Sequence, residues 1–517
     1  MGLIQIQEPL APSVHVQRIS EVEQMGPICL IIPPSLFLLD DRVFMTLGIL
    51  KVAAVLEREG VKVDMLDLSG IKNFEEVVSD YMGEYPDVKR FGLTSTTPQM
   101  PAATKILKVI KQKNPHARVI LGGPHITLIN AAYKNEIKRG VVGRAHKEMM
   151  HVQEVFDVLV AGDGEGAVFG ALKEYSPRLI DADDKKSELF MSSSMLETLP
   201  LPARHLVDVG SYHYSIDGFR ALSLIAQLGC PYRCKFCGGR LSDSLRKIRT
   251  RSSQLVVDEM VHLWRTYGVT GFMLYDDELN VSKNMLELME LITQTQRDLG
   301  VEWRLRGFIK SELFTQQQAD AMYRAGFRWI LTGFESGSPQ ILKAIDKNAT
   351  REENTRCVEF ARKAGLKVKA LMSIGHPGET EETIEETRKW LLEVKPDDFD
   401  VSIITCYPGT PYYDEAEPHP HLPGVWVYTY KGDTLYQIEV DYNVTADYYK
   451  GDPNGGYRAY VYTDTLKPED LVRLRDFIER DVRKKLCIPF NPSASAVSYE
   501  HSMGQTGIPH TILRRSR

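Results

Sequence analysis

Three cysteines stand close together at a spacing that suits an iron–sulfur cluster. Cys230, Cys234 and Cys237 lie in the segment 227–239, QLGCPYRCKFCGG. Three thiolates from one short loop can bind three irons of a 4Fe-4S cluster and leave the fourth iron free for another molecule. A zinc site normally has four nitrogen or sulfur ligands, and no fourth Cys or His lies near this loop. A disulfide suits a secreted chain. The pattern therefore favours a cluster with one open iron.

This cysteine loop, with Phe236 directly before the third cysteine, resembles the signature of radical SAM enzymes. The resemblance implies that the open iron binds the amino and carboxylate groups of S-adenosylmethionine (SAM). One electron from the cluster then cleaves SAM to a 5'-deoxyadenosyl radical, which abstracts hydrogen from a substrate. The resemblance also implies that Phe236 lies near the adenine.

The elements around the loop are predicted to form an open barrel. From residue 222, apolar strands alternate with amphipathic helices. The six expected strands are 222–228, 271–275, 303–308, 329–334, 368–374 and 400–405. Six such units predict a partial (β/α)6 barrel, in which reactive groups lie at the carboxyl ends of the strands.

Three consecutive acids, Asp276, Asp277 and Glu278, follow the second expected strand. The resemblance implies that this strand end contacts the amino group of SAM, and a buried ammonium needs such acceptors. Alternatively, the acids favour the dipole of a following helix, or one of them faces the substrate.

Other strand ends resemble nucleotide-binding positions of the family. Glu335 and Ser336 resemble the end that contacts the ribose, and Ile374 and Gly375 the end that contacts the adenine. His376 departs from the family pattern; it is either a proton shuttle or a hydrogen-bond donor behind the site.

Two further candidates lie on the expected strands. Arg304 and Arg306 point to the same face, and we expect one of them, Arg306, to bind the SAM carboxylate. Cys406 closes the sixth strand. It is either a hydrogen-atom donor to a substrate radical or a small buried apolar residue.

The N-terminal half predicts a doubly wound parallel sheet. Apolar strands at 27–32, 61–67, 91–95, 117–125 and 155–161 alternate with helices. Ligands of such sheets bind beyond the carboxyl ends of the strands.

This half resembles the cobalamin-binding domain that precedes many radical SAM barrels. Ser95 and the pair Gly122-Gly123, with 26 residues between them, match the family pattern, although Thr97 replaces its leucine. The resemblance implies that the glycines let the cobalamin nucleotide tail pass close to the backbone, and that no histidine ligates the cobalt from below, because the mutase-type Asp-x-His-x-x-Gly loop is missing. The implied contacts are Thr94, Ser95, Gly122, Gly123, His125, Gly162 and Gly164.

Two alternatives concern this domain. It is either a cobalamin site or a scaffold that has lost its ligand, since fold does not fix function. The basic segment 130–154 is read as a solvated helix; the alternative is that it reshapes the corrin cleft.

Bulk composition excludes several classes. The net charge of -6 among 517 residues gives no footprint for nucleic acid, and no apolar run approaches the ~20 residues that span a bilayer. The N-terminus lacks the features of a signal peptide, and the four other cysteines are dispersed. We therefore expect a cytoplasmic protein that works on a small molecule with an electron donor such as flavodoxin or ferredoxin; its oligomeric state stays open.

The expected architecture is α/β with three parts. Residues 1–195 form the cobalamin-binding-like domain, 196–411 the radical SAM barrel, and 412–517 an α+β cap with a loose tail of about thirty residues. The leading prediction is cobalamin-dependent methylation of an unactivated carbon in a natural-product or cofactor precursor. Alternatives are cobalamin-independent dehydration, deoxygenation, epimerisation or cyclisation of a sugar-like substrate such as an aminoglycoside, and a non-catalytic iron–sulfur electron carrier.

Overall fold

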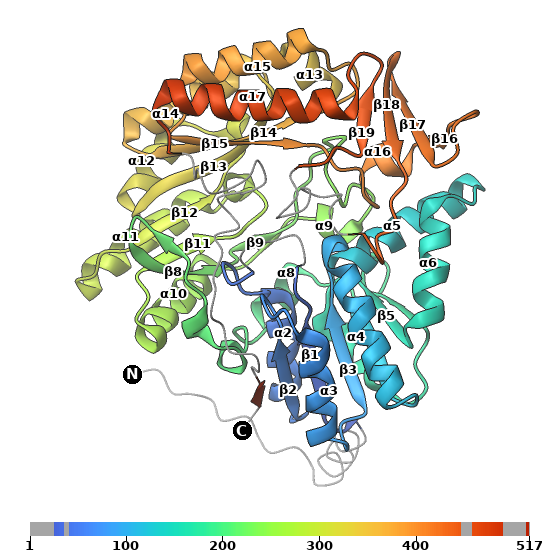
Figure 1. Cartoon of the computed structure of the whole chain (residues 1–517). Coiled ribbons are helices and arrows are strands. Elements are labelled where there is room, and N and C mark those ends of the chain that lie inside the picture. Colours follow the sequence, from blue (N-terminus) through green and yellow to red (C-terminus); the bar gives the residue numbers. More distant parts are fainter. Residues whose placement is uncertain (1–24, 36–40, 446–456, 490–512, 516–517) are drawn as a thin grey trace.

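The computed structural model describes residues 25–35, 41–445, 457–489 and 513–515. Two seven-stranded sheets dominate these residues, one in each half of the chain (Figure 1). A four-stranded antiparallel sheet and a two-stranded ribbon complete the strand content of the described ranges. The described part contains no helix that is both long and apolar enough to cross a membrane.

The N-terminal sheet has the strand order β20-β2-β1-β3-β4-β5-β6, and every neighbouring pair except β20–β2 is parallel. Its strands are β1 (Ile28–Ile32), β2 (Val63–Asp67), β3 (Arg90–Thr94), β4 (Arg118–Gly122), β5 (Val158–Ala161), β6 (Leu179–Asp181) and β20 (Leu513–Arg515). Its helices are α2 (Leu47–Arg58), α3 (Phe74–Glu84), α4 (Met100–Lys113), α5 (Pro124–Arg139), α6 (Arg144–Val155) and α7 (Gly164–Leu172). The strands β1 and β2 are buried along their whole length because helices cover both faces. The predicted doubly wound sheet is confirmed.

Two predicted strands are shorter than the sequence indicated. β4 ends at Gly122 because Gly123 turns the chain with a φ of 96° and Pro124 begins α5, a position that suits proline. His125 therefore lies in the first turn of a helix instead of at a strand end. Residue 155 ends α6, and β5 begins only at Val158.

The second seven-stranded sheet has the order β15-β14-β13-β12-β11-β8-β7. It consists of six parallel strands and the short antiparallel β7, which confirms the predicted six-unit partial barrel. Its strands are β7 (Ser215–Ile216), β8 (Phe219–Leu224), β11 (Gly271–Leu274), β12 (Arg304–Phe308), β13 (Phe327–Glu335), β14 (Lys367–Ile374) and β15 (Asp398–Ile403). The helices that flank it are α10 (Ser253–Tyr267), α11 (Met285–Leu299), α12 (Gln316–Arg324), α13 (Pro339–Ala344), α14 (Arg351–Ala364) and α15 (Glu381–Val394).

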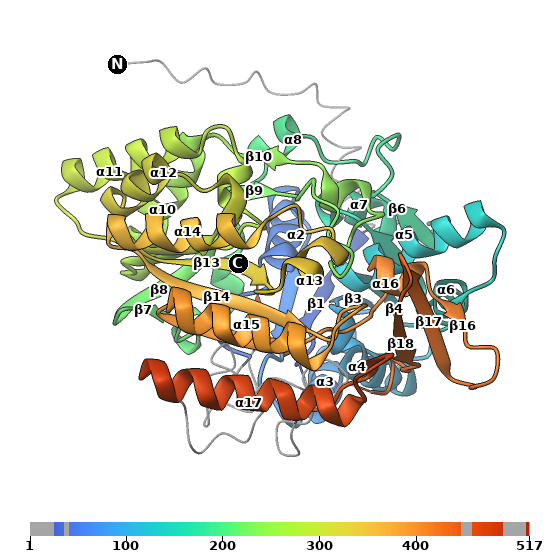
Figure 2. The same cartoon turned by 90° about the horizontal axis from the view of Figure 1, so that it is seen from above.

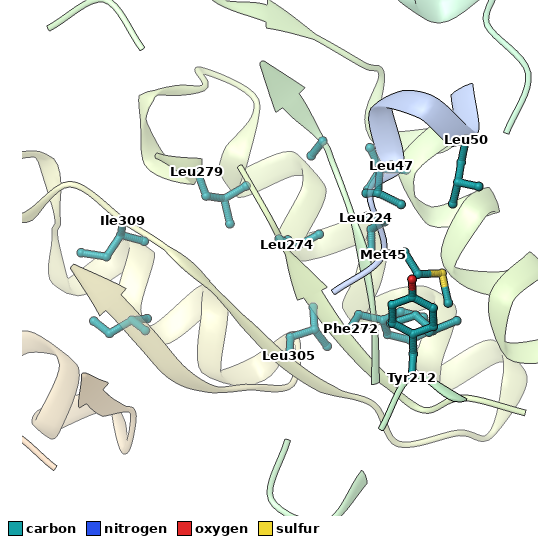
Figure 3. Packing of buried hydrophobic residues seen from close by; sticks show 14 of the residues in the cluster. Met45, Leu47, Leu50, Tyr212, Leu224, Phe272, Leu274, Leu279, Leu305 and Ile309 are labelled. Carbon is teal, nitrogen blue, oxygen red and sulfur yellow. The ribbon is translucent and has the colours of Figure 1, made fainter. Parts of the chain in front are cut away.

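The two halves share one hydrophobic core. Met45, Leu47 and Leu50 at the start of α2 lie beside Leu224 and Phe272 of the barrel strands (Figure 3). Each such side chain contributes about 1.5–3 kcal/mol when it is fully buried. The N-terminal sheet is therefore packed onto the barrel instead of being tethered by a linker.

The C-terminal part adds a sheet and a helix. The antiparallel strands β16 (Glu417–Pro418), β17 (Val425–Tyr430), β18 (Asp433–Ile438) and β19 (Val461–Thr463) lead into α17 (Pro468–Leu486), which lies along the barrel in Figure 2. Side chains of α17 pair with the free edge of β15: Val401 N donates to Glu479 Oε1 at 2.7 Å, and Arg475 Nε donates to Val401 O at 3.0 Å. An open barrel leaves such an edge unpaired, and α17 supplies partners for the backbone of Val401 on it.

We expect Glu479→Leu to destabilise the chain by about 3–5 kcal/mol, the cost of breaking a buried ion pair. The change removes the acceptor of Val401 N and the buried partner of Arg475 and Arg483. The midpoint of urea unfolding measures the loss. The exposed Glu469→Leu on the same helix is the control, and equal midpoints for the two variants would contradict the prediction.

The basic segment 130–154 is solvated along much of its length, as predicted, because Lys134, Lys138, Arg139 and Lys147 are exposed; Arg144 is the exception. It forms most of the hairpin of α5 and α6, which packs on the C-terminal sheet. The guanidinium of Arg144 is 8% exposed, lies 3.8 Å from the Tyr413 ring centroid and donates to Tyr413 O at 2.9 Å. Arg139 donates to Asp414 O at 2.9 Å. Two of the basic residues, Arg139 and Arg144, therefore connect this hairpin to the cap.

The predicted loose tail is corrected in one place. Residues 513–515 form β20 and pair antiparallel with β2, the edge strand of the N-terminal sheet. The rest of the tail, 490–512 and 516–517, lies outside the described residues. The domain bounds at 195 and 411 stay a prediction.

Candidate active site

The cysteine loop is held at both of its ends by backbone contacts. It connects β9 (Gln227–Leu228) to β10 (Arg249–Thr250), which pair antiparallel. Cys230 N donates to Leu245 O at 3.0 Å. Gly229 has a φ of 89°, and a Cβ there would lie 2.1 Å from Lys247 O, so the position before the first cysteine requires glycine. The loop is thus closed on itself independently of any cofactor.

The donor set of this loop fits an iron–sulfur cluster. The three cysteines are free thiols, with Cys234 buried and the other two half-buried. No group of three His, Cys, Asp or Glu side chains within the described ranges converges as a single metal ion requires. A 4Fe-4S cluster makes no such demand, since its thiolates bind different irons. Burial raises the pKa of Cys237 to about 12, and metal binding deprotonates such a thiol outright.

The structure separates the three consecutive acids after β11. Asp276 is buried and accepts from the backbone N–H groups of Ala226 and Gln227. Asp277 Oδ2 accepts from Gly229 N at 3.0 Å, directly before the first cysteine. These two acids therefore fix the entry into the cysteine loop. Glu278 differs from the other two acids. Among the described residues, no backbone N–H group donates a hydrogen bond to its carboxylate.

Glu278 belongs to a buried charged cluster that the sequence analysis missed. Burial raises its pKa to about 7, while Lys347 and Lys310 act to lower it. Lys347 Nζ lies 3.2 Å from Glu335 Oε1, and Lys310 Nζ lies 2.6 Å from Glu312 Oε1. Both lysines are at most 5% exposed. They follow β12 and α13 and carry no motif of their own, so nothing in the sequence singled them out.

A hydrogen-bonded chain runs from Glu335 to the predicted adenine side. Glu335 adopts the left-handed region with a φ of 65°, which strains a non-glycine residue. Its Oε2 accepts from Ser373 Oγ at 2.8 Å, and Ser373 Oγ lies 2.8 Å from His376 Nε2. His376 Nδ1 lies 3.2 Å from Tyr412 Oη, and its ring meets Phe236 edge-on at 5.5 Å. His376 thus has a hydrogen-bonding neighbour on each ring nitrogen, and the choice between proton shuttle and hydrogen-bond donor stays a prediction.

We expect His376→Gln to remove one contribution that makes the protein less stable in acid. Burial lowers the pKa of His376 to about 3, against about 6.5 when unfolded, so between these values the unfolded chain binds one more proton. Stability of the wild type therefore falls as pH drops from 6.5 toward 3, by up to about 1.4 kcal/mol per unit from this residue. Buried acids such as Glu379, whose pKa burial raises to about 7, change stability in the opposite direction. The free energy of unfolding in urea is measured for wild type and variant at pH 7.0 and 5.5. The difference between the two proteins at each pH isolates the contribution of the histidine. An unchanged difference at the two pH values would refute this.

Four other predicted residues have the following surroundings. Ser336 Oγ lies 3.0 Å from Thr387 Oγ1 and accepts from Ser338 N, so its hydroxyl is engaged within the fold. Ile374 has its side chain in the main core, and Gly375 N donates to Glu379 Oε2 at 2.9 Å. Arg306 is half-buried, with its guanidinium 5.7 Å from the Trp329 ring centroid. Their roles toward SAM stay predictions.

Cys406 is half-buried against the main core. Burial raises its pKa to about 12, so its sulfur stays a neutral thiol at physiological pH. A neutral thiol is the form that either hypothesis for this residue requires, and the choice between hydrogen donor and packing residue stays open.

The carboxyl edge of the N-terminal sheet brings the predicted cobalamin residues together. Ser95 N donates to Gly122 O at 3.1 Å, and His125 N donates to Ser95 O at 2.9 Å. A Cβ on Gly123 would lie 2.6 Å from Thr94 Oγ1, so this glycine lets two loops meet. A Cβ on Gly122 would be 3.7 Å from its nearest neighbour, so no chain contact requires glycine there. An unexplained glycine at this edge fits a ligand that passes close to the backbone.

His125, Gly162 and Gly164 are engaged inside the protein. His125 is fully buried, with Nδ1 3.0 Å from Thr97 Oγ1 and Nε2 3.7 Å from Glu148 Oε1. A Cβ on Gly162 would lie 2.5 Å from Asp183 N, and one on Gly164 would lie 3.0 Å from a methyl group of Val52. Packing therefore accounts for these three residues, and their contact with cobalamin stays a prediction.

Comparisons with known proteins match both halves. The model of the radical SAM superfamily matches residues 224–391, and that of the B12 binding domain matches residues 42–153. An uncharacterized methyltransferase of Pyrococcus horikoshii is 27% identical over 394 residues, which are 75% of this chain and 83% of the relative. The anaerobic magnesium-protoporphyrin IX monomethyl ester cyclase of Cereibacter sphaeroides is 25% identical over 64% of this chain, but the match spans only 53% of that relative.

Solved structures support the fold. The radical SAM methyltransferase TsrM from Kitasatospora setae, determined with cobalamin and a 4Fe-4S cluster, superposes with a TM-score of 0.61 over 90% of this chain and 91% of that chain, at 18% identity. A likeness at this identity shows a shared fold. The two domain matches and the three-cysteine loop show that the chain is a radical SAM enzyme of the class that carries a B12-binding domain.

Proposed function

We propose that this enzyme methylates an unactivated carbon of a small natural-product or cofactor precursor, with cobalamin as the methyl carrier. The observation that carries the proposal is the order of the two domains on one chain, with three free cysteines in one loop of the second and, in the first, a strand end at Gly122 where no chain contact requires glycine. The methyltransferase relative is matched over 83% of its length, more than the cyclase relative.

The bound cofactors supply the electron, the radical source and the methyl group. The residues of the chain position these cofactors. The three cysteines hold the cluster, and Asp276 and Asp277 fix the entry of their loop. We infer that Glu278, Lys347 and Glu335 line the end at which SAM binds, because a zwitterionic ligand needs acceptors for its ammonium and a cation for its carboxylate. Lys347 and Glu335 are buried, which keeps water from these two charges.

A reductant is needed to supply the electron. We propose that a small redox protein such as flavodoxin or ferredoxin supplies this electron. The three cysteines provide for one cluster, and the sequence shows no further motif for clusters that could relay electrons.

The test measures cofactors first and products second. The full chain is expressed with cobalamin supplied, purified without oxygen and reconstituted with iron and sulfide. Methyl transfer predicts about one corrin per cluster, and two products from SAM: S-adenosylhomocysteine from methyl donation and 5'-deoxyadenosine from hydrogen abstraction. Absence of corrin beside a full cluster would refute cobalamin dependence. Formation of 5'-deoxyadenosine under dithionite would exclude the electron-carrier alternative.

Ring closure is the second candidate, favoured by the cyclase relative. It uses no methyl group. Bound corrin with 5'-deoxyadenosine but without S-adenosylhomocysteine, in the presence of substrate, would select it over methylation.

A further inference from the structure

The buried carboxylate of Asp183, in the N-terminal domain, accepts hydrogen bonds from the segment that follows the third cysteine. Asp183 comes directly after β6 and is 1% exposed. Its Oδ1 accepts from Ser242 Oγ at 2.6 Å, Ser244 N at 2.9 Å and Ser244 Oγ at 2.5 Å. Charge-assisted bonds to a buried carboxylate are among the stronger hydrogen bonds in proteins. The turn at Ser242 is therefore fixed by a residue of the other domain.

A buried arginine makes a second connection between the same two loops. Arg249 on β10 is 2% exposed and forms an ion pair through Nη1 with Asp163 Oδ2. Its Nη2 donates to Ser244 O at 3.1 Å. Asp163 stands between Gly162 and Gly164, in the loop predicted to contact cobalamin. Arg249 is paired in register with Leu228, two residues before Cys230.

These contacts form an unbroken path. A Cβ on Gly162 would lie 2.5 Å from both Ala182 C and Asp183 N, so the loop after β5 is in direct contact with the carboxylate-bearing segment. At the other end, Leu245 N donates to Ser242 Oγ at 3.1 Å, and Leu245 O accepts from Cys230 N at 3.0 Å. Every link from Gly162 to the first cysteine is a hydrogen bond, an ion pair or a backbone contact.

We propose that Asp183, Asp163 and Arg249 are positioning residues that couple cobalamin binding in the first domain to cluster binding in the second. This inference rests on the proposed cobalamin dependence. A ligand that orders the loop at Gly162 also orders the turn at Ser242, and the second cofactor then meets a loop that is already in place. Such coupling is reciprocal and typically amounts to 5- to 150-fold in affinity.

The test compares affinities in two states of the full-length protein. Hydroxocobalamin is titrated into cluster-reconstituted protein and into cluster-free protein, and corrin absorbance gives both dissociation constants. We expect the wild type to bind hydroxocobalamin about tenfold more tightly when the cluster is present. By linkage, hydroxocobalamin should raise by the same factor the chelator concentration at which half of the iron is lost at equilibrium.

Variants separate coupling from folding. Asp183→Ala removes three hydrogen bonds and should bring the two dissociation constants within about twofold of each other, with full iron content after reconstitution. Asp183→Asn keeps an acceptor and should retain most of the coupling. Ser242→Ala removes one bond and gives an intermediate value even if Asp183→Ala does not fold. Asp481→Ala, which breaks the ion pair of Arg388 on the outer helices, is the control.

Each outcome decides the question. The inference is supported if the ratio of the two dissociation constants for hydroxocobalamin falls in Asp183→Ala and Ser242→Ala. The same ratio must be retained in Asp183→Asn and Asp481→Ala. A wild-type ratio near one, or an unchanged ratio in both junction variants, overturns it and leaves the proposed function standing. A wild type that binds no hydroxocobalamin in either state overturns both.

Discussion

In Cys234→Ala, iron retained after reconstitution is expected to fall from about four atoms per chain to near zero. Cys234 is the buried member of the three thiols, and a serine or alanine there leaves two ligands for a cluster that the fold holds by three. Cleavage of SAM should fall by more than about 100-fold, the loss that follows removal of even an outer partner of a metal ligand.

The exposed Cys487→Ala serves as the matched control, because it removes a free thiol outside the loop. Iron and sulfide analysis with the absorbance near 400 nm reports the cluster, and 5'-deoxyadenosine reports cleavage. Normal iron content in Cys234→Ala would rule out the assignment of this loop as the cluster site. Loss of iron in Cys487→Ala as well would point to general instability of the protein.

Lys347→Met is expected to cost about 3–5 kcal/mol of folding stability, because it leaves the Glu335 carboxylate buried without its cation. The same change should weaken SAM binding, since Lys347 and Glu278 lie in one charged cluster beside Cys234. Removing a buried charge partner at a binding site typically costs 2–5 kcal/mol, or roughly 30-fold and upward in affinity.

Two comparisons make this prediction specific. Lys343→Met alters an exposed lysine of the same helix region and should change neither property. In the double variant Lys347→Met with Glu335→Gln, the neutral glutamine needs no cation, so stability should recover in part relative to Lys347→Met alone. Strictly additive losses in urea unfolding would show that the two side chains do not depend on each other.

The elements and their functional ends were largely predictable because the signals are local. Strand periodicity gave the six barrel strands, and the loops that carry the cysteines, the three acids and Glu335 fall at carboxyl ends, as parallel β/α sheets require. The pair Ser95 and Gly122 was identified by resemblance to the cobalamin-binding pattern, and the same rule places it at one edge, since carboxyl ends of neighbouring parallel strands meet there.

What could not be predicted depends on contacts between distant segments. Asp276 and Asp277 read as equal neighbours of Glu278, yet hydrogen bonds to residues some fifty positions earlier give them a structural role. Lys347 stands out only when β13 and α13 bring it to Glu335. Arg144 looked like a solvent-exposed charge because its aromatic partners, Tyr413 and Trp426, lie more than 260 residues later. The spacing of residues in the sequence does not indicate such pairs.

The pairing of α17 with β15 has a consequence for biosynthesis. Proteins emerge from the ribosome from the N-terminus onward, and their domains generally fold in that order. When residue 403 has left the ribosome, all six parallel strands of the barrel exist, but the edge at Val401 still lacks its side-chain partners. A nascent chain at this stage exposes a template for strand addition. The barrel therefore depends on Glu479 and Arg475, made more than seventy residues later, to leave its aggregation-prone stage.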